Sequence, residues 1–239
     1  MTFEIKAYGG PTVQFRYGTL TVLTDPTFDA PGDYPIGDRA LTKTAPANGT
    51  PGPVDLVLLS HDEHPDNLDH AGRALLATVP LVLSTPGAAE RIGAPVRGLD
   101  DWESTVVGAV RVTAVPAQHG PEGVLHLTGA VAGFVLEGEG LPTVYVSGDN
   151  ASLRVVEEIA GRFPAIDVAI LFGGAAKTAL VGDATLTLTA AEMATAARIL
   201  GATSVYAAHV DSWAHFTEGI DEVRKAFAAA GLSGVLREA

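Results

Sequence analysis

The sequence predicts a layered α/β domain, and three observations support that fold class. The chain has 239 residues, 47% of them hydrophobic and 18% charged, which is enough apolar material for a sizeable core. Its 27 glycines and 15 prolines are scattered, as expected where many short strands are joined by tight turns. Strand-like and helix-like segments occur in mixed order without a linker-like break, so we expect residues 1–239 to form a single domain.

The first part of the chain is expected to contain short strands and then a long loop. Strand-like runs at 2–8, 13–17 and 20–24 are separated by glycine-containing turns, which is typical of a meander. Residues 25–53 are rich in Pro, Gly, Asp and Thr and show no clear periodicity. We expect this segment to be a loop that forms one wall of any pocket.

The later elements follow from apolar spacing and from helix-start signals. Residues 54–60, VDLVLLS, form a near-continuous apolar run, typical of a strand that is covered on both faces. Thr189 and Glu192 form a capping-box pattern that predicts a helix through 193–200. The same criteria predict helices at 71–78, 86–92, 153–163 and 221–230, and strands at 81–84, 106–115, 130–136, 143–147, 168–171 and 204–208.

Composition narrows the classes of function. The formal net charge of −13, with only 15 Lys plus Arg, would repel a phosphate backbone, so we expect no nucleic acid partner. The chain has no cysteine, so any metal must be held by nitrogen and oxygen ligands. The N-terminus lacks the basic and apolar regions of a signal peptide, and no uncharged apolar stretch is long enough to span a bilayer. We therefore expect a cytoplasmic protein without membrane segments.

Four apolar runs each stop at a residue that can bind a metal. These runs end at His61, His119, Asp149 and His209. In layered α/β folds the carboxyl ends of strands converge on one rim, so residues far apart in sequence can meet there. A lone histidine more often caps a strand or satisfies a local hydrogen bond, but four such endings together favour a shared metal site.

The densest polar cluster is HDEHPDNLDH, residues 61–70. It combines three imidazoles with four carboxylates, the ligand types that Zn, Fe and Mn favour. The alternative is an acidic turn with a helix N-cap at Asp66 or Asp69. The sequence contains no Gly-x-Ser-x-Gly elbow, which counts against a serine hydrolase.

The block LLSHDEHPDNLD resembles the metal-binding motif of the metallo-β-lactamase superfamily, a strand followed by His-x-His-x-Asp-His. Three later blocks, VPAQHGP, YVSGDN and AAHVDSW, are similar to the further motifs of that superfamily and come in the same order. The opening GGPTVQF and TVLTDPTF resembles the lactonase-like branch that includes ascorbate-6-phosphate lactonase. The resemblance covers nearly the whole chain and implies a four-layer αββα sandwich with metals in a cleft along one edge.

The resemblance also implies roles for individual residues. One divalent ion would be held by His61, His64 and His119, and a second by Asp66 and His209, with Asp149 bridging the two. The expected cofactor is therefore one or two ions of Zn or Mn, with Fe as a further candidate.

The motif departs from the superfamily pattern at two positions. In the usual His-x-His spacing the second histidine would stand at position 63, which is Glu63 here, and the nearest histidine, His64, comes one residue later. Either residue could coordinate the metal, and we rank His64 slightly ahead. Asn67 replaces a histidine, and its neutral amide would weaken or abolish the second metal. His215 could line the pocket and contact metal or substrate, with a surface role as an equal alternative, and Asp25 is expected to hydrogen-bond a metal-bound histidine.

The leading hypothesis is a metal-dependent hydrolase that cleaves an ester, lactone or phosphoester bond of a small intracellular molecule. A divalent ion lowers the pKa of its bound water and polarises the scissile group, and Asp66 is the catalytic candidate to orient that water and carry its proton. The competing hypothesis, favoured by Asn67 and Glu63, is a non-catalytic metal-binding or ligand-sensing protein with a degenerate site. The only partner expected is the small-molecule substrate, and the sequence leaves open whether the chain forms a homo-oligomer.

Overall fold

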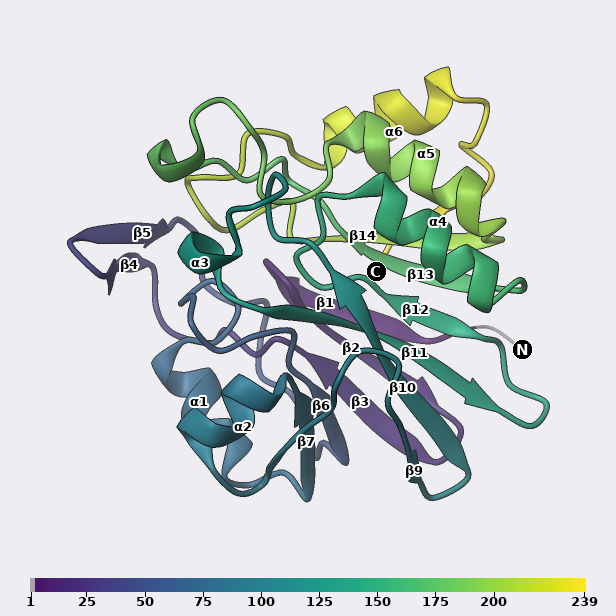
Figure 1. Ribbon diagram of the computed structural model, residues 1–239, viewed down its shortest axis with the longest axis horizontal. Coiled ribbons are helices and arrows are strands. Elements are labelled where there is room, and N and C mark those ends of the chain that lie inside the picture. Colours follow the sequence, from purple (N-terminus) through teal and green to yellow (C-terminus); the bar gives the residue numbers. More distant parts are fainter. Residues whose placement is uncertain (1–2) are drawn as a thin grey trace.

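The computed structural model describes residues 3–239 and consists of four layers. Two β-sheets lie face to face at the centre, and helices cover the outer face of each sheet (Figure 1). This arrangement confirms the predicted αββα sandwich. The outer layers are α1 (His70–Leu76) and α2 (Pro86–Ile92) on one side, and α4 (Leu153–Arg162), α5 (Ala190–Leu200) and α6 (Ile220–Ala229) on the other.

The first sheet has six strands in the order β1-β2-β3-β6-β7-β8. Its first three strands pair antiparallel, and the pairs from β3 onward are parallel. The strands are β1 (Ile5–Gly9), β2 (Thr12–Tyr17), β3 (Leu20–Thr24), β6 (Leu56–Leu58), β7 (Leu81–Ser84) and β8 (Val96–Gly98).

The second sheet has seven strands in the order β15-β14-β13-β12-β11-β10-β9. Here β9 to β12 pair antiparallel, whereas β12 to β15 pair parallel. The strands are β9 (Ser104–Val107), β10 (Val110–Ala117), β11 (Val131–Gly138), β12 (Val144–Val146), β13 (Val168–Phe172), β14 (Ser204–Ala208) and β15 (Leu236–Arg237).

Three apolar clusters hold the layers together. The central cluster lies between the two sheets and includes Phe15, Leu58 and Phe134. One outer cluster packs α4, α5 and α6 against the second sheet, and the other packs α1 and α2 against the first sheet. Because β6, β7 and β13 are covered on both faces, their residues are apolar almost without interruption.

The predicted capping box is confirmed. Thr189 Oγ accepts a hydrogen bond from Glu192 N at 3.2 Å, and Glu192 Oε2 accepts one from Thr189 N at 2.9 Å. The helix α5 therefore begins at Ala190, earlier than the predicted span of 193–200. Thr2, the first residue of the predicted opening strand, lies outside the described residues.

Two predicted elements are wrong, and both errors involve a two-residue hairpin turn. The expected loop at 25–53 contains a hairpin of β4 (Gly32–Ile36) and β5 (Arg39–Lys43), and the expected single strand at 106–115 is divided between β9 and β10. Gly37 and Gly108 occupy these turns with φ of 60° and 61°, a backbone conformation that glycine adopts without steric cost. The β4–β5 hairpin projects from the same edge of the molecule as the short helix α3 (Leu125–Thr128) (Figure 1).

No helix within residues 3–239 has the length and apolar character needed to cross a membrane.

A close backbone approach at Gly72 leads to a stability prediction. A Cβ atom on Gly72 in α1 would lie 1.8 Å from Pro26 O, whereas one on Gly161 in α4 would meet no described atom within 4 Å. Alanine in a helix gains about 0.5–1 kcal/mol over glycine, so Gly161→Ala should raise the free energy of unfolding. We expect Gly72→Ala to lower it by about 1–3 kcal/mol or more, because Pro26 cannot move without displacing Asp25. Urea denaturation of both variants measures the difference, and equal effects would contradict the packing described.

Candidate metal centre

The potential ligands lie at the carboxyl ends of strands from both sheets. His61 follows β6 of the first sheet, and His119, Asp149 and His209 follow β10, β12 and β14 of the second sheet. The structure therefore brings together the residues that the four strand endings predicted. With His64 and Asp66 from the loop after β6, they form two groups with ligand atoms within 4.8 Å of one another: His61, His64 and His119, and Asp66, Asp149 and His209.

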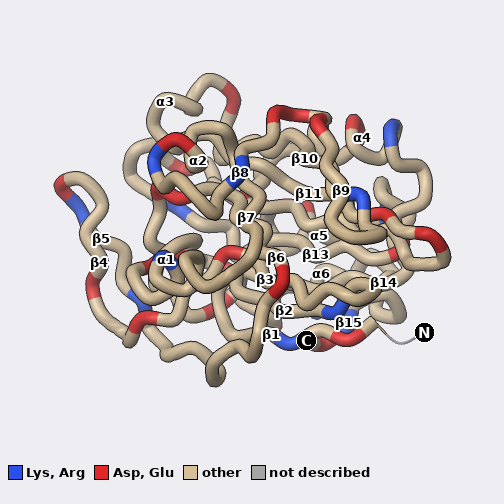
Figure 2. Tube along the Cα trace, turned by 90° about the horizontal axis from the view of Figure 1, so that it is seen from below, with Lys and Arg blue, Asp and Glu red and all other residues tan. Residues whose placement is uncertain are grey.

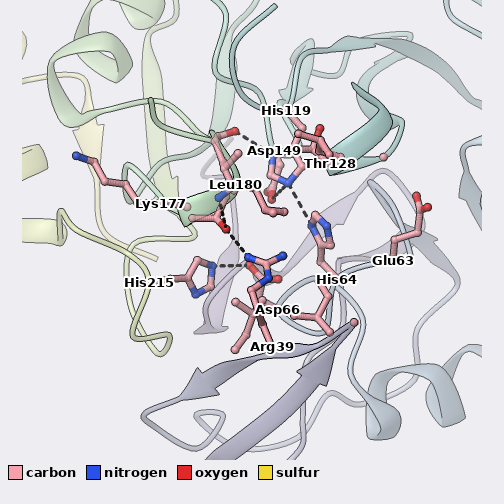
Figure 3. A pocket seen from close by; sticks show the side chains of 18 of the residues that line it. Arg39, Glu63, His64, Asp66, His119, Thr128, Asp149, Lys177, Leu180 and His215 are labelled. Carbon is pink, nitrogen blue, oxygen red and sulfur yellow. Dashed lines mark hydrogen bonds and ion pairs between the residues drawn. The ribbon is translucent and has the colours of Figure 1, made fainter. Parts of the chain in front are cut away.

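The first group consists of three imidazoles whose nitrogens converge. His64 Nδ1 lies 3.0 Å from His61 Nε2 and 3.2 Å from His119 Nε2. Ligand nitrogens around a tetrahedral ion with bonds of about 2.0–2.1 Å are separated by about 3.3 Å, so these spacings fit a Zn-sized cation. Figure 3 shows His64 and His119 facing each other at the cavity.

Backbone carbonyls fix the tautomers of two histidines. His119 Nδ1 lies 3.0 Å from Leu186 O, and His209 Nδ1 lies 3.2 Å from Gly173 O. A carbonyl oxygen only accepts hydrogen bonds, so Nδ1 of each ring carries a proton. In the neutral ring, Nε2 then presents its lone pair to the centre, which is the form that a metal ligand requires.

His61 is oriented by a relay through Ser60. Asp25 Oδ1 accepts hydrogen bonds from Ser60 N at 2.9 Å and from Ser60 Oγ at 2.7 Å. Ser60 Oγ, having donated its proton, lies 2.9 Å from His61 Nδ1 and accepts a hydrogen bond from it. Asp25 thus acts on the histidine through Ser60, whereas the sequence predicted a direct hydrogen bond.

The second group contains two carboxylates and one imidazole, all buried. Asp66 Oδ2 lies 3.3 Å from His209 Nε2. Asp149 Oδ1 lies 3.6 Å from His209 Nε2, and its other oxygen, Oδ2, lies 3.7 Å from His119 Nε2. Asp149 therefore directs one oxygen toward each group, which is the geometry that a carboxylate shared by two cations needs.

The pKa shifts reflect burial and mutual repulsion. Burial lowers the pKa of His64 to about 4, with repulsion from His119 adding to the effect, so this ring is neutral at neutral pH. Burial also lowers the pKa of His61 well below its ordinary value, and His64 adds to that shift. At His209 burial acts in the same direction, but the carboxylates of Asp149 and Asp66 outweigh it and raise the pKa to about 9. The protein thus favours positive charge between these carboxylates, which a divalent cation would supply.

Both departures from the superfamily motif have a structural explanation. Glu63 points away from the histidines, and its carboxylate lies 3.1 Å from Arg91 Nη2 (Figure 3). His64, one residue later, takes the place beside His61 and His119. Asn67 Nδ2 lies 3.2 Å from Asp149 Oδ1 and donates a hydrogen bond to it, so the amide orients Asp149.

His215 lies at the centre although it is outside the two ligand groups. Its Nε2 lies 3.0 Å from Asp66 Oδ2, and Figure 3 shows the two side chains joined across the cavity. Among residues 3–239, neither Asp66 Oδ1 nor His215 Nδ1 has a hydrogen-bond partner. Buried polar atoms without partners are costly, so their presence beside a cavity is consistent with a site that binds a further polar group.

Four residues of the two groups, His64, Asp66, His119 and Asp149, line a cavity of about 630 Å³, with His61 and His209 buried behind them. Its walls come from the β4–β5 hairpin, the α3 segment, the loop around Thr178 and His215. The sequence pointed to residues 25–53 and to His215 as parts of a pocket wall, but not to α3 or to the loop around Thr178. Ser60 and the carbonyls of Leu186 and Gly173 were also missed. Ser60 gave a weak signal, a hydroxyl directly before the first histidine, whereas a backbone carbonyl gives none.

A family model described as the β-lactamase superfamily domain matches residues 21–210. A protein of Methanosphaerula palustris named UPF0173 metal-dependent hydrolase is 31% identical over 196 residues, covering 79% of this chain and 83% of the relative. The chain belongs to the β-lactamase superfamily of metal-dependent hydrolases.

Solved structures share the fold at low sequence identity. A possible metal-dependent hydrolase from Veillonella parvula has a TM-score of 0.85 and 18% identity, covering 100% of this chain and 97% of that one. An isothiocyanate hydrolase from Delia radicum gut bacteria has a TM-score of 0.81 and 20% identity, covering 98% and 95%. CmlA, a diiron β-hydroxylase from Streptomyces venezuelae, has a TM-score of 0.69 and 18% identity, covering 99% of this chain and 52% of that one. At these identities the likeness concerns the fold alone.

The shared carboxylate gives a prediction about metal content. Asp149→Ala removes the oxygens that face both groups, so the purified variant should lose most of its bound metal in elemental analysis. The control is His70→Ala, because His70 is exposed, pairs with Asp29 and does not line the cavity. Unchanged metal stoichiometry in Asp149→Ala, or a large loss in His70→Ala, would mean that the ligands have been assigned incorrectly.

The relay through Ser60 gives a second prediction. Ser60→Ala removes the acceptor that orients His61, and we expect metal affinity to fall about 10- to 100-fold. Ser84 is equally buried at the end of the neighbouring strand β7, and its hydroxyl has no partner among the described residues. Ser84→Ala should therefore leave affinity unchanged in a competition titration with a chromophoric chelator. A similar loss in both variants would show that the effect is one of packing.

Proposed function

We propose that the protein cleaves an ester, lactone or phosphoester bond of a small molecule with the help of one or two divalent ions. The observation that carries this proposal is the position of Asp149, whose two oxygens face two separate ligand groups below one cavity. A cavity of about 630 Å³ is within the range of small-molecule sites. A bound divalent ion would supply hydroxide near neutral pH and polarise the scissile group.

The donor atoms support specific metals. The group of His61, His64 and His119 offers three imidazole nitrogens, which favours Zn. The group of Asp66, Asp149 and His209 offers two carboxylates and one imidazole, a harder ligand set that suits Mn or Fe as well as Zn. Because residue 67 is an asparagine, the second group lacks the imidazole found at that position in the superfamily motif, and the amide donates a hydrogen bond to Asp149 instead. We infer that the second group binds its ion more weakly than the first.

Asp66 is the proposed proton acceptor. Its Oδ2 is engaged by His209 and His215, while its buried Oδ1 has no partner among the described residues. Burial would raise the pKa of Asp66, but His215 and His209 outweigh that effect and lower it well below the ordinary value, so the carboxylate is ionised at neutral pH. Oδ1 can therefore accept a hydrogen bond from the attacking water and orient it.

His215 is the proposed proton carrier between the site and the cavity. It lines the cavity wall, and its Nε2 contacts Asp66 while its Nδ1 is free of protein partners among residues 3–239. Because the ionised Asp66 accepts a hydrogen bond from Nε2, a protonated His215 would carry its second proton on Nδ1, and this proton could be passed to a leaving group.

The alternative function is a metal-binding or ligand-sensing protein without turnover, and Asn67 is the observation that favours it. The fixed tautomers of His119 and His209 hold lone pairs in place for a cation, which an enzyme and a non-catalytic metal-binding protein need equally. Both hypotheses require bound metal, so turnover is the property that separates them.

Removing and restoring the metal tests the proposed function. Purified protein should hydrolyse at least one of 4-nitrophenyl acetate, bis(4-nitrophenyl) phosphate and a simple γ-lactone, and dialysis against a chelator should reduce the rate by about 100-fold or more. Adding Zn, Mn or Fe separately to the stripped protein then identifies the ion that restores activity. Tight metal binding without hydrolysis of any of the three would support the non-catalytic alternative, and turnover that survives complete stripping would contradict the metal mechanism.

A further inference from the structure

Large exposed apolar side chains are concentrated at the mouth of the cavity. Within residues 3–239 five large hydrophobic residues are exposed, and three of them line this cavity: Leu125, Leu127 and Leu180, with 63%, 41% and 45% of their surface accessible. The other two, Val106 and Ile220, line other surface depressions. Exposed apolar patches are uncommon on soluble proteins unless something binds there.

These leucines belong to a wall built from three separate segments. Leu125 and Leu127 lie on α3, Leu180 lies in the one-turn helix η1 (Ala179–Val181), and Ile36 and Leu41 face the cavity from the β4–β5 hairpin. Figure 3 shows Leu180 among the side chains around the cavity, between Asp149 and Asp66 in this view. Because different elements contribute, the apolar surface surrounds the route to the metal ligands instead of forming a flat patch.

The charges at the rim nearly cancel. The residues that line the cavity include two basic side chains, Arg39 and Lys177, and two acidic ones away from the ligand groups, Asp38 and Glu63. Figure 2 shows acidic and basic residues side by side at the tip of the β4–β5 hairpin. Arg39 is also engaged, because its Nη1 donates a hydrogen bond to Thr178 Oγ1 at 2.5 Å across the mouth. The rim therefore lacks the surplus of positive charge with which phosphate sites are usually built.

We propose that the cavity binds substrates with an apolar chain or ring, and that the bond cleaved is a carboxylic ester or lactone. The inference rests on the proposed hydrolase function and names the substrate class of the same site. Water adds to the acyl carbon, the acyl carbon–oxygen bond breaks, and the products are a carboxylic acid and an alcohol, so no further reactant is needed. The apolar body lies against Leu125, Leu127 and Leu180, which directs the acyl group toward the ligand groups.

Chain-length dependence tests this inference in two independent measurements. Metal-loaded protein is titrated calorimetrically with acetate, butanoate, hexanoate and octanoate, and kcat/KM is measured with the matching 4-nitrophenyl esters. Burial of a methylene group is worth up to about a fourfold change in affinity, so we expect a rise of about two- to fourfold per added methylene in both series.

A triple variant and a matched control identify the surface responsible. The triple variant combines Leu125→Gln, Leu127→Gln and Leu180→Gln, which keep side-chain size and helix propensity but make the wall polar. In this variant the affinity and kcat/KM should depend little on chain length, so the slope of each against the number of methylenes should be nearly zero. The control is Val106→Thr on β9, because Val106 is 62% exposed and far from α3 (Figure 1). Its slope should equal that of the unaltered protein, and circular dichroism checks the fold of both variants.

The outcomes separate this inference from the proposed function. If none of the esters is hydrolysed but carboxylate affinity rises with length and depends on the three leucines, the apolar subsite stands and the proposed hydrolysis of carboxylic esters fails. If esters are hydrolysed with no dependence on chain length, or with the same slope in the triple variant, the proposed function stands and the apolar subsite is refuted. Faster turnover of bis(4-nitrophenyl) phosphate than of any ester would overturn the choice of ester over phosphoester.

Discussion

The arrangement of the site depends on hydrogen bonds that hold Nδ1 of three candidate ligand histidines and leave Nε2 of each free for a cation. Leu186 O, Gly173 O and Ser60 Oγ accept from the Nδ1 atoms of His119, His209 and His61. Ser60 and Gly173 follow the buried strands β6 and β13, and the segment of Leu186 is tied to the chain after β13 by the hydrogen bond from Leu186 N to Ala176 O. The directions of the three lone pairs are therefore set by the folded backbone around the site. A cation then finds a site whose geometry has largely been determined by folding.

The two-sheet core explains why residues so distant in sequence can meet with this accuracy. His61 comes from one sheet and His119, Asp149 and His209 from the other, so the site spans the seam between the sheets. Two residues at this site have strained backbones. His209 has φ of 60° and Asp25 has φ of 31°, and positive φ values are uncommon for residues other than glycine. Such conformations persist where the surrounding contacts fix them, and here they turn both side chains toward the centre.

The fold class and the grouping of most candidate ligands could be predicted because they leave marks in the sequence. Apolar runs that end at His61, His119, Asp149 and His209 indicate strands that deliver polar residues to one rim, and the structure brings these four residues together. The role of Ser60 and the positions of Leu186 O and Gly173 O depend on three-dimensional contacts, which a single sequence does not reveal. The two missed turns did leave a signal, because each two-residue turn contains a glycine, Gly37 in one and Gly108 in the other. Around Gly37 the apolar residues are too sparse to indicate strands. Around Gly108 the alternation of apolar and polar residues continues through the turn, so the two strands look like one.

The β4–β5 hairpin is fixed at one end and open at the other. At its base, the buried Lys43 lies 3.2 Å from Asp69, the N-cap residue of α1, and the backbone of Thr42 and Thr44 bonds to the segment that leads to His215. Its tip, at Gly37 and Asp38, is exposed and makes part of the cavity rim. Substitutions or insertions at the tip can therefore reshape the entrance while the base keeps the reactive groups aligned. This division allows related proteins to acquire new substrates by drift in one short hairpin, without rebuilding the chemistry beneath it.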